Sequence, residues 1–180
     1  MRRKKRKEKR NRILVLIDWE NLRLSIKSTS IDPQDLSLTS GFDKLISWLE
    51  ETGDIFGFFI FAPLHILRTI GTISYLHKFT MIACPKIPKT EIEKKIKDTT
   101  DETLIRFGKM MIQEISGLTH LCIGSGDAHF LPLLEIAKGE KLEIMLTCGT
   151  FESLSHNLPI LIDKNPVSQK KHFHLFDPTR

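Results

Sequence analysis

The chain has 180 residues, of which 41% are hydrophobic and 27% are charged. These proportions are ordinary for a globular protein, and the length is most simply that of one domain. No apolar run approaches the roughly 20 residues that a membrane span needs, and three scattered cysteines argue against both a zinc framework and a disulfide framework.

The net charge of +5 is unevenly distributed. Residues 1–12 hold nine of the 27 basic residues and one of the 22 acidic residues, which gives +8; the rest therefore has 18 basic and 21 acidic residues, or −3. We interpret residues 1–12 as a basic, disordered tail that suits a polyanion such as RNA. A solvated arm without a partner is the alternative. The apolar run Ile13–Ile17 is too short for a secretory signal, so we expect a cytoplasmic protein.

Downstream of the basic tail, short strand-like runs alternate with longer helical stretches. The predicted elements, in chain order, are a strand at 13–18, a helix at 42–51, a strand at 55–61, a helix at 64–79, a strand at 80–84, a loop or short exposed helix at 86–97, a helix at 101–116, a strand at 121–124, a helix at 129–138, a strand at 142–147, a helix near 151–158 and an edge strand at 172–176. This alternation predicts a three-layer α/β/α sandwich with a mainly parallel central sheet. We place the domain at residues 13–165, followed by a C-terminal extension, 166–180, that includes the edge strand.

In such sheets the functional crevice lies beyond the carboxyl ends of the strands. Asp18 follows five aliphatic residues at the end of the first strand, and Asn21 comes three residues later. Neighbouring Trp19 is interpreted as a packed core residue, with stacking on a base as the alternative.

Two further acidic segments are predicted at helix starts. Asp98 and Asp101 flank a pair of threonines that can cap the helix that follows, with Glu102 in its first turn. Asp127 follows Gly124-Ser125-Gly126, where we expect glycine to permit a tight turn, although a simple helix cap also explains this aspartate.

Carboxylates that converge from separate segments repel one another unless a cation neutralises them. Oxygen ligands without cysteine indicate Mg²⁺ or Mn²⁺ rather than zinc. Sites of this kind activate water and stabilise charge on a phosphodiester.

Three segments of the chain resemble the NYN domain, the LabA-like branch of the PIN-like nuclease superfamily. They are Leu16-Ile-Asp-Trp-Glu-Asn-Leu22, Asp101 with its apolar helix, and Ser125-Gly-Asp-Ala-His-Phe130. The resemblance covers roughly residues 12–165 and implies a PIN-like fold of Rossmann-like topology. It also implies a Mg²⁺- or Mn²⁺-dependent nuclease that acts most often on RNA.

Carried over by position, the resemblance implies that Asp18, Asp101 and Asp127 hold the metal ion. Asn21 would orient water or a substrate phosphate, and Ser125 would line the pocket.

The chain departs from the family at two positions that often carry acids, where it has Phe107 and His129. Asp98 or Glu102 could compensate, or His129 could act as a ligand or an acid. The alternative function is therefore an RNA-binding module that keeps the fold and the metal pocket but cuts weakly or not at all. A basic stretch between Lys86 and Lys97 is interpreted either as a solvated face or as a rim that contacts phosphate.

Two other classes fit less well. A phosphoryl-transfer domain would have an Asp-x-Asp pattern, but position 20 is Glu. A P-loop or dinucleotide-binding enzyme would have a glycine-rich motif after the first strand, and none is present. The oligomeric state stays open, and a homodimer is among the states that the sequence allows.

Overall fold

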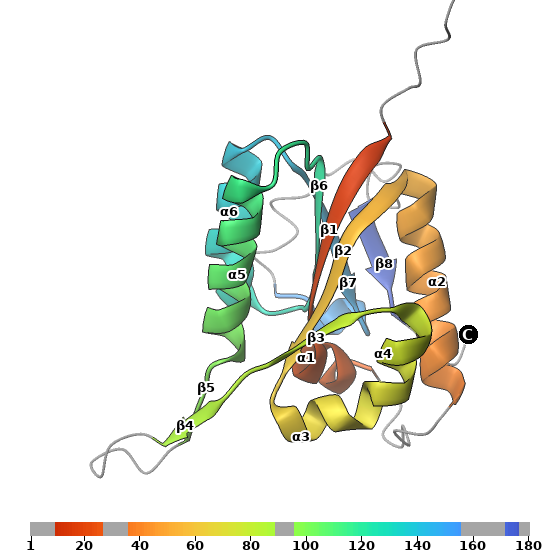
Figure 1. The fold of residues 1–180 in the computed structure, drawn as a ribbon, viewed down its shortest axis with the longest axis vertical. Coiled ribbons are helices and arrows are strands. Elements are labelled where there is room, and N and C mark those ends of the chain that lie inside the picture. Colours follow the sequence, from red (N-terminus) through yellow and green to blue (C-terminus); the bar gives the residue numbers. More distant parts are fainter. Residues whose placement is uncertain (1–9, 27–35, 89–95, 156–171, 177–180) are drawn as a thin grey trace, which may run out of the picture.

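The computed structural model describes residues 10–26, 36–88, 96–155 and 172–176. Its centre is a six-stranded, wholly parallel sheet with helices on both faces (Figure 1). Across the sheet the strands are β3 (Thr80–Ala83), β2 (Gly53–Ala62), β1 (Asn11–Asp18), β6 (His120–Gly124), β7 (Glu143–Cys148) and β8 (Phe173–Leu175). In chain order this arrangement is third, second, first, fourth, fifth and sixth, the doubly wound order of Rossmann-like folds. The predicted three-layer α/β/α class is confirmed.

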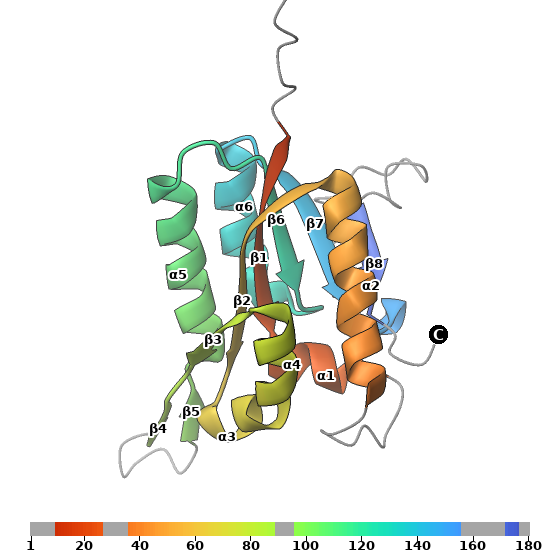
Figure 2. The ribbon, with the colours of Figure 1, turned by 45° about the vertical axis from the view of Figure 1, so that its right-hand side comes forward.

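The two helical layers are assembled from different parts of the chain (Figure 2). One layer contains α1 (Trp19–Leu24), α2 (Leu36–Thr52), α3 (Leu64–Leu67), the 3₁₀ turn η1 (Arg68–Ile70) and α4 (Gly71–His77). The other layer contains α5 (Thr100–Glu114), the 3₁₀ turn η2 (Ala128–Phe130) and α6 (Leu131–Gly139). Among the described helices, none is both long and apolar enough to cross a membrane.

Some predicted elements have different boundaries in the structure. The helix predicted at 42–51 begins at Leu36, and the single helix predicted at 64–79 is divided into α3, η1 and α4. The helix predicted near 151–158 is the short 3₁₀ turn η3 (Phe151–Ser153), and its last three positions lie outside the described residues.

The central strand β1 is buried on both faces, as its apolar run predicts. It is flanked by β2 and β6, and residues 13–18 are all buried. A strand in this position contributes apolar side chains to both cores, which explains why its sequence is continuous rather than alternating.

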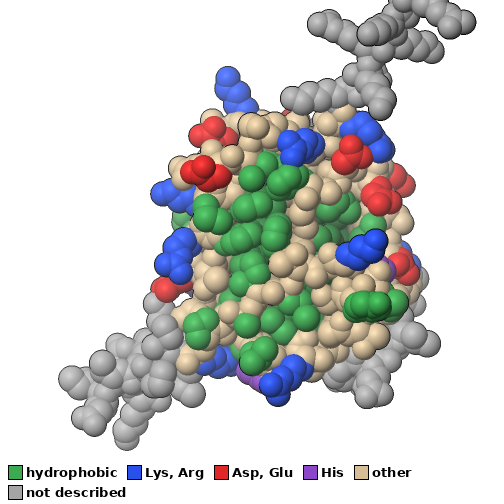
Figure 3. Space-filling model, viewed as in Figure 1, with side chains coloured by type: hydrophobic (Ala, Val, Ile, Leu, Met, Phe, Trp, Pro, Cys, Tyr) green, Lys and Arg blue, Asp and Glu red, His purple; other side chains and the backbone are tan. Residues whose placement is uncertain are grey.

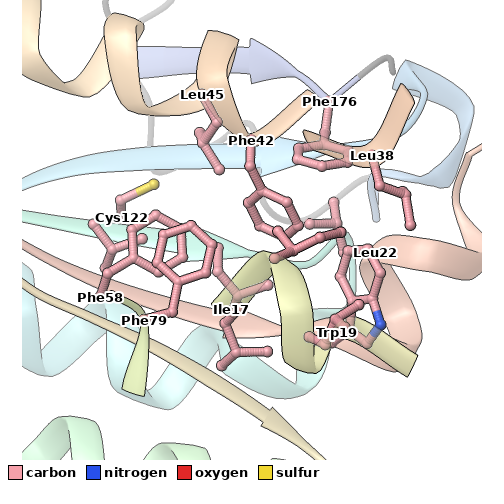
Figure 4. Close-up of a cluster of buried hydrophobic side chains, with 14 of the residues drawn as sticks. Ile17, Trp19, Leu22, Leu38, Phe42, Leu45, Phe58, Phe79, Cys122 and Phe176 are labelled. Carbon is pink, nitrogen blue, oxygen red and sulfur yellow. The ribbon is translucent and has the colours of Figure 1, made fainter. Parts of the chain in front are cut away.

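An aromatic cluster fills the core between the sheet and the α1–α2 layer (Figure 4). The Phe42 ring lies 5.0 Å from those of Phe79 and Phe176 and 5.5 Å from that of Trp19, measured between centroids. Trp19 is fully buried here, so it packs as the favoured interpretation held, and the alternative that it stacks on a base is wrong.

The edge strand predicted near the end of the chain is confirmed as β8, which pairs in parallel with β7. The residue after it, Phe176, is fully buried in the aromatic cluster. The three cysteines are buried and free, as predicted: Cys84, Cys122 and Cys148.

The segment predicted to be a loop or a short helix is instead a small antiparallel ribbon. Strand β4 (Lys86–Pro88) pairs with β5 (Ile96–Asp98), and the ribbon projects from the domain (Figures 1 and 2). At its base the Thr99 hydroxyl donates to the carbonyl oxygen of Pro85 at 2.7 Å. Cross-strand pairing between residues about ten positions apart therefore decides the conformation of this segment.

Candidate functional site

The candidate site lies where the strand order reverses, between β1 and β6. Parallel strands end at the same edge of the sheet, and the reversal separates the connections that leave neighbouring strands, which leaves room for a ligand. Asp18 is the last residue of β1, and Ser125 to Asp127 follow directly after β6. Helix α5 begins beside them and brings Asp101 in its first turn.

Asp18 is buried, with 2% of its surface exposed, and it caps α1. The backbone N–H of Asn21 donates to Oδ1 at 3.2 Å, and the Asn21 side-chain amide donates to Oδ2 at 2.6 Å. Burial raises the pKa of Asp18 to about 7, and the charges of Asp101 and Glu20 add to that rise; both hydrogen bonds from Asn21 oppose it. Asn21 thus orients the Asp18 carboxylate.

Asp127 caps the 3₁₀ turn η2. Its Oδ1 accepts from the backbone N–H of His129 at 3.0 Å, while its own N–H donates to the Ser125 hydroxyl oxygen at 3.2 Å. Ser125 is fully buried. The predicted helix cap is therefore present, and it points the second carboxylate oxygen of Asp127 away from the turn that it closes.

The glycines around Ser125 have a different role from the one predicted. Neither has a positive φ, so the backbone there is not left-handed. A Cβ at Gly126 would instead collide with the carbonyl oxygen of Ser153, and one at Gly124 with the side chain of Ile17. Close packing of η3 and β1 against this loop, rather than a tight turn, accounts for glycine at both positions.

Three ligand-type side chains gather at this edge: Asp101, Asp127 and His129 each offer one atom, and these atoms all lie within 4.8 Å of one another. Nδ1 of His129 is 3.0 Å from Oδ1 of Asp127 and 3.8 Å from Oδ2 of Asp101. The hydrogen bond to Asp127, the charge of Asp127 and then that of Asp101 raise the pKa of His129. His129, considered from the sequence as an additional ligand, is thus part of the close cluster, whereas Asp18 lies beside the cluster and is coupled to it through the charge of Asp101.

The two acids considered as substitutes are placed differently. Glu102 is exposed on α5 and is not a member of the close cluster. The backbone of Asp98 is in β5, opposite Lys86, and its side chain lies outside what the structure describes.

Phe107, at the other position where the family often has an acid, faces the sheet. Its ring centroid is 4.7 Å from that of Phe59 and 5.5 Å from that of Phe61. An acid at this position would be placed among aromatic rings on β2.

Thr99 is a residue whose role the sequence did not reveal. It occupies the position before α5, but its side chain makes no cap hydrogen bond and instead fixes the ribbon at Pro85. No local sequence signal marks a bond between residues 14 positions apart. By holding the start of α5 against the chain that leaves β3, this bond places Asp101 at the sheet edge.

The fold and the site together define a doubly wound α/β protein with an acidic cluster at its switch point. No protein-family model matches the chain, and no curated protein matches it. It is similar in structure to a solved protein of unknown function from Vibrio parahaemolyticus RIMD 2210633, with a TM-score of 0.65 and 15% sequence identity; the match covers 88% of this chain and 93% of the other. At this identity the likeness shows the fold alone.

Proposed function

We propose that the protein is a divalent-metal-dependent nuclease that hydrolyses phosphodiester bonds in RNA. The observation that carries the proposal is the convergence of Asp101, Asp127 and His129, next to the buried Asp18, at the switch point of the sheet. The resemblance to the NYN domain supports RNA as the substrate. A cytoplasmic location is part of the same proposal.

The side chains present fit a divalent cation in kind and in spacing. Carboxylate oxygens suit Mg²⁺ and Mn²⁺, and imidazole suits Mn²⁺ better than Mg²⁺. Ligand atoms within 4.8 Å of one another need only small side-chain rotations to reach oxygen–metal distances of about 2.0–2.2 Å. Among the described residues, no basic side chain forms an ion pair with Asp18, so a buried carboxylate at this edge has no protein cation to balance it.

In this proposal Asp101, Asp127 and His129 bind the ion, and Asp18, oriented by Asn21, completes the negative field around it. A bound ion would polarise the scissile phosphate and make a nearby water more acidic. The buried Ser125 keeps the loop after β6 in place by accepting from the N–H of Asp127. The donors and acceptors around the carboxylates are therefore arranged before any ligand arrives.

The alternative is an RNA-binding module that retains the metal pocket without cleaving. It is favoured by the two positions where acids are replaced. Phe107 is committed to packing on β2, and His129 contributes no negative charge when neutral.

A cleavage assay with matched substitutions tests the proposal. Asp101→Asn should abolish hydrolysis of a mixed-sequence RNA in Mn²⁺ or Mg²⁺, whereas Glu102→Gln, at the adjacent exposed acid, should leave it nearly unchanged. Titration calorimetry with Mn²⁺ should show weaker binding for Asp101→Asn only. If the wild type binds Mn²⁺ and RNA but does not cleave, the non-cleaving alternative replaces the nuclease.

A further inference from the structure

Helix α5 connects the candidate site to the opposite edge of the sheet. Its first turn carries Asp101, and it runs back beside the strands to their amino ends (Figures 1 and 2). Beyond its last turn, Nη1 of Arg12 donates to the carbonyl oxygen of Ser116 at 2.8 Å. The 15 residues of α5 span ~22 Å at a rise of about 1.5 Å per residue. One surface helix thus leads from the acidic cluster to the start of β1, where the basic residues 1–12 join the domain.

The exposed side of α5 has a basic centre. Residues at spacings of four, three and four form one exposed stripe: Glu102, Arg106, Lys109 and Gln113. Arg106 and Lys109 form no ion pair with any residue that the structure describes, and both are exposed. Figure 3 shows Lys and Arg side chains on this flank of the molecule. Two unneutralised cations on one helical face attract a polyanion.

The opposite helical layer has the reverse charge. The exposed ionisable side chains of α2 are three acids and one lysine: Asp43, Lys44, Glu50 and Glu51. A nucleic-acid strand that leaves the candidate site is therefore repelled from the α2 flank and attracted to the α5 flank.

We propose that α5 is the track along which an RNA strand lies, with its phosphates contacted by Arg106 and Lys109. The direction of the track rests on the proposed function, because the scissile phosphate is taken to lie at Asp101. Along the helix axis Arg106 is ~7.5 Å and Lys109 is ~12 Å from Asp101. At ~3.4 Å per nucleotide of a stacked strand, these residues contact phosphates about two and about four nucleotides from the site.

The same geometry sets a substrate length. A strand of about seven nucleotides spans α5 and reaches Arg12, and a longer strand also meets the basic residues 2–9. The Arg12 side chain is itself held by Ser116 and lies over the Phe56 ring, with Cζ 4.5 Å from the centroid. The protein should accordingly prefer single strands longer than about seven nucleotides to short oligonucleotides.

Binding measurements on the full chain test the track. The double variant Arg106→Gln with Lys109→Gln removes both cations and keeps good helix formers. The matched control, Lys44→Gln with Lys78→Gln, removes the same charge from exposed positions on the opposite layer. A fluorescent 12-nucleotide RNA is titrated by anisotropy in EDTA between 50 and 200 mM salt.

The α5 variant should bind roughly tenfold more weakly, with a salt slope shallower by about 1.4, since each lost phosphate contact on a single strand removes about 0.7. The control pair should bind like the wild type. The exchange Arg106→Lys with Lys109→Arg keeps both charges and should keep the affinity. If the α5 variant binds like the control pair, the track is wrong. Cleavage does not occur in EDTA, so a wild type that binds through α5 but never cuts contradicts the nuclease and leaves the track standing.

Discussion

Asp18 and Trp19 are neighbours in the chain and are both buried, yet their surroundings are opposite. Trp19 belongs to the aromatic flank, the cluster formed by Trp19, Phe42, Phe58, Phe79 and Phe176. Asp18 belongs to the acidic edge, formed by Asp18, Asp101, Asp127 and His129. The aromatic flank is packed in contacts that favour folding, whereas the acidic edge places like charges near one another. The protein therefore concentrates stability on one side of β1 and leaves its ligand-binding potential on the other.

The largest expected effect comes from breaking the aromatic flank. Phe42 is fully buried and touches four other rings of the core, so Phe42→Ala should lower the free energy of unfolding by about 4 kcal/mol. Urea unfolding followed by circular dichroism measures the loss. Tyr75→Ala, at a side chain that is 84% exposed, is the control and should change stability little.

The milder variant Phe42→Leu keeps the protein folded if the alanine variant does not fold. Its affinity for Mn²⁺ should equal that of the wild type, because the aromatic flank does not supply ligands. A loss below about 1 kcal/mol for Phe42→Ala, or a weaker metal site in Phe42→Leu, would show that the two regions are not separate in the way described.

The second effect acts on the acidic edge and has the opposite sign. The pKa of Asp18 is raised from 3.8 to about 7, so its contribution to stability is most favourable below about pH 4 and is lost as the pH rises towards 7. Asp18→Asn removes that buried charge and should stabilise the metal-free protein by ~2 kcal/mol at pH 8. The same substitution should weaken Mn²⁺ binding.

Unfolding at pH 4 and pH 8 tests the sign, because the gain should shrink at the lower pH. Asp54→Asn, at an exposed carboxylate that pairs with Arg10 at 2.7 Å, provides the matched control and should not stabilise. A destabilised Asp18→Asn protein at pH 8 would mean that the Asp18 carboxylate serves the fold rather than a ligand.

The third effect concerns His129, which occupies a position where the NYN resemblance often places an acid. His129→Asp adds a negative oxygen ligand to a cluster whose atoms lie within 4.8 Å of one another. Mg²⁺ affinity should rise about tenfold, and any Mg²⁺-dependent cleavage should rise with it. Calorimetry measures the affinity, and His65→Asp, at an exposed histidine on α3, controls for the added charge. Equal Mg²⁺ affinity in the wild type and His129→Asp would place the residue outside the reach of the ion and favour the non-cleaving alternative.

The sequence predicted the parts of this arrangement that depend on local pattern. Continuous apolar runs marked β1 and β6, because strands buried on both faces need apolar residues at every position. Asp18 and Asp127 were then predicted at the sheet edge because they come directly after those runs. The edge strand β8 was predicted from the alternation of residues 172–176.

The remaining features depend on partners that are distant in the sequence. Trp19 packs because Phe42 and Phe176 meet it from α2 and from the end of β8. The β4–β5 ribbon forms through cross-strand pairing, which a lysine-rich segment does not announce. Asp18 is held beside the close cluster rather than inside it by two hydrogen bonds from Asn21, and no spacing rule contains that information.

The smallest expected effect sharpens the comparison from the aromatic side. His174 on β8 stacks on Trp48 at 5.2 Å between centroids, and its Nδ1 is 3.3 Å from the Thr147 hydroxyl. Burial, and then the charge of Lys44, lowers the pKa of His174 to about 4. Between pH 6.5 and 4 the unfolded chain therefore binds a proton that the folded protein excludes, so stability falls as the pH falls through this window. His174→Gln keeps a polar group for Thr147 and removes the titration. After allowance for partial exposure, the variant should lose ~1 kcal/mol less than the wild type between pH 7 and pH 5. Urea unfolding at the two pH values measures this difference, in which the opposing contribution of Asp18 cancels because both proteins contain it. His65→Gln should behave like the wild type, and an equal pH dependence for His174→Gln would show that β8 does not exclude the proton.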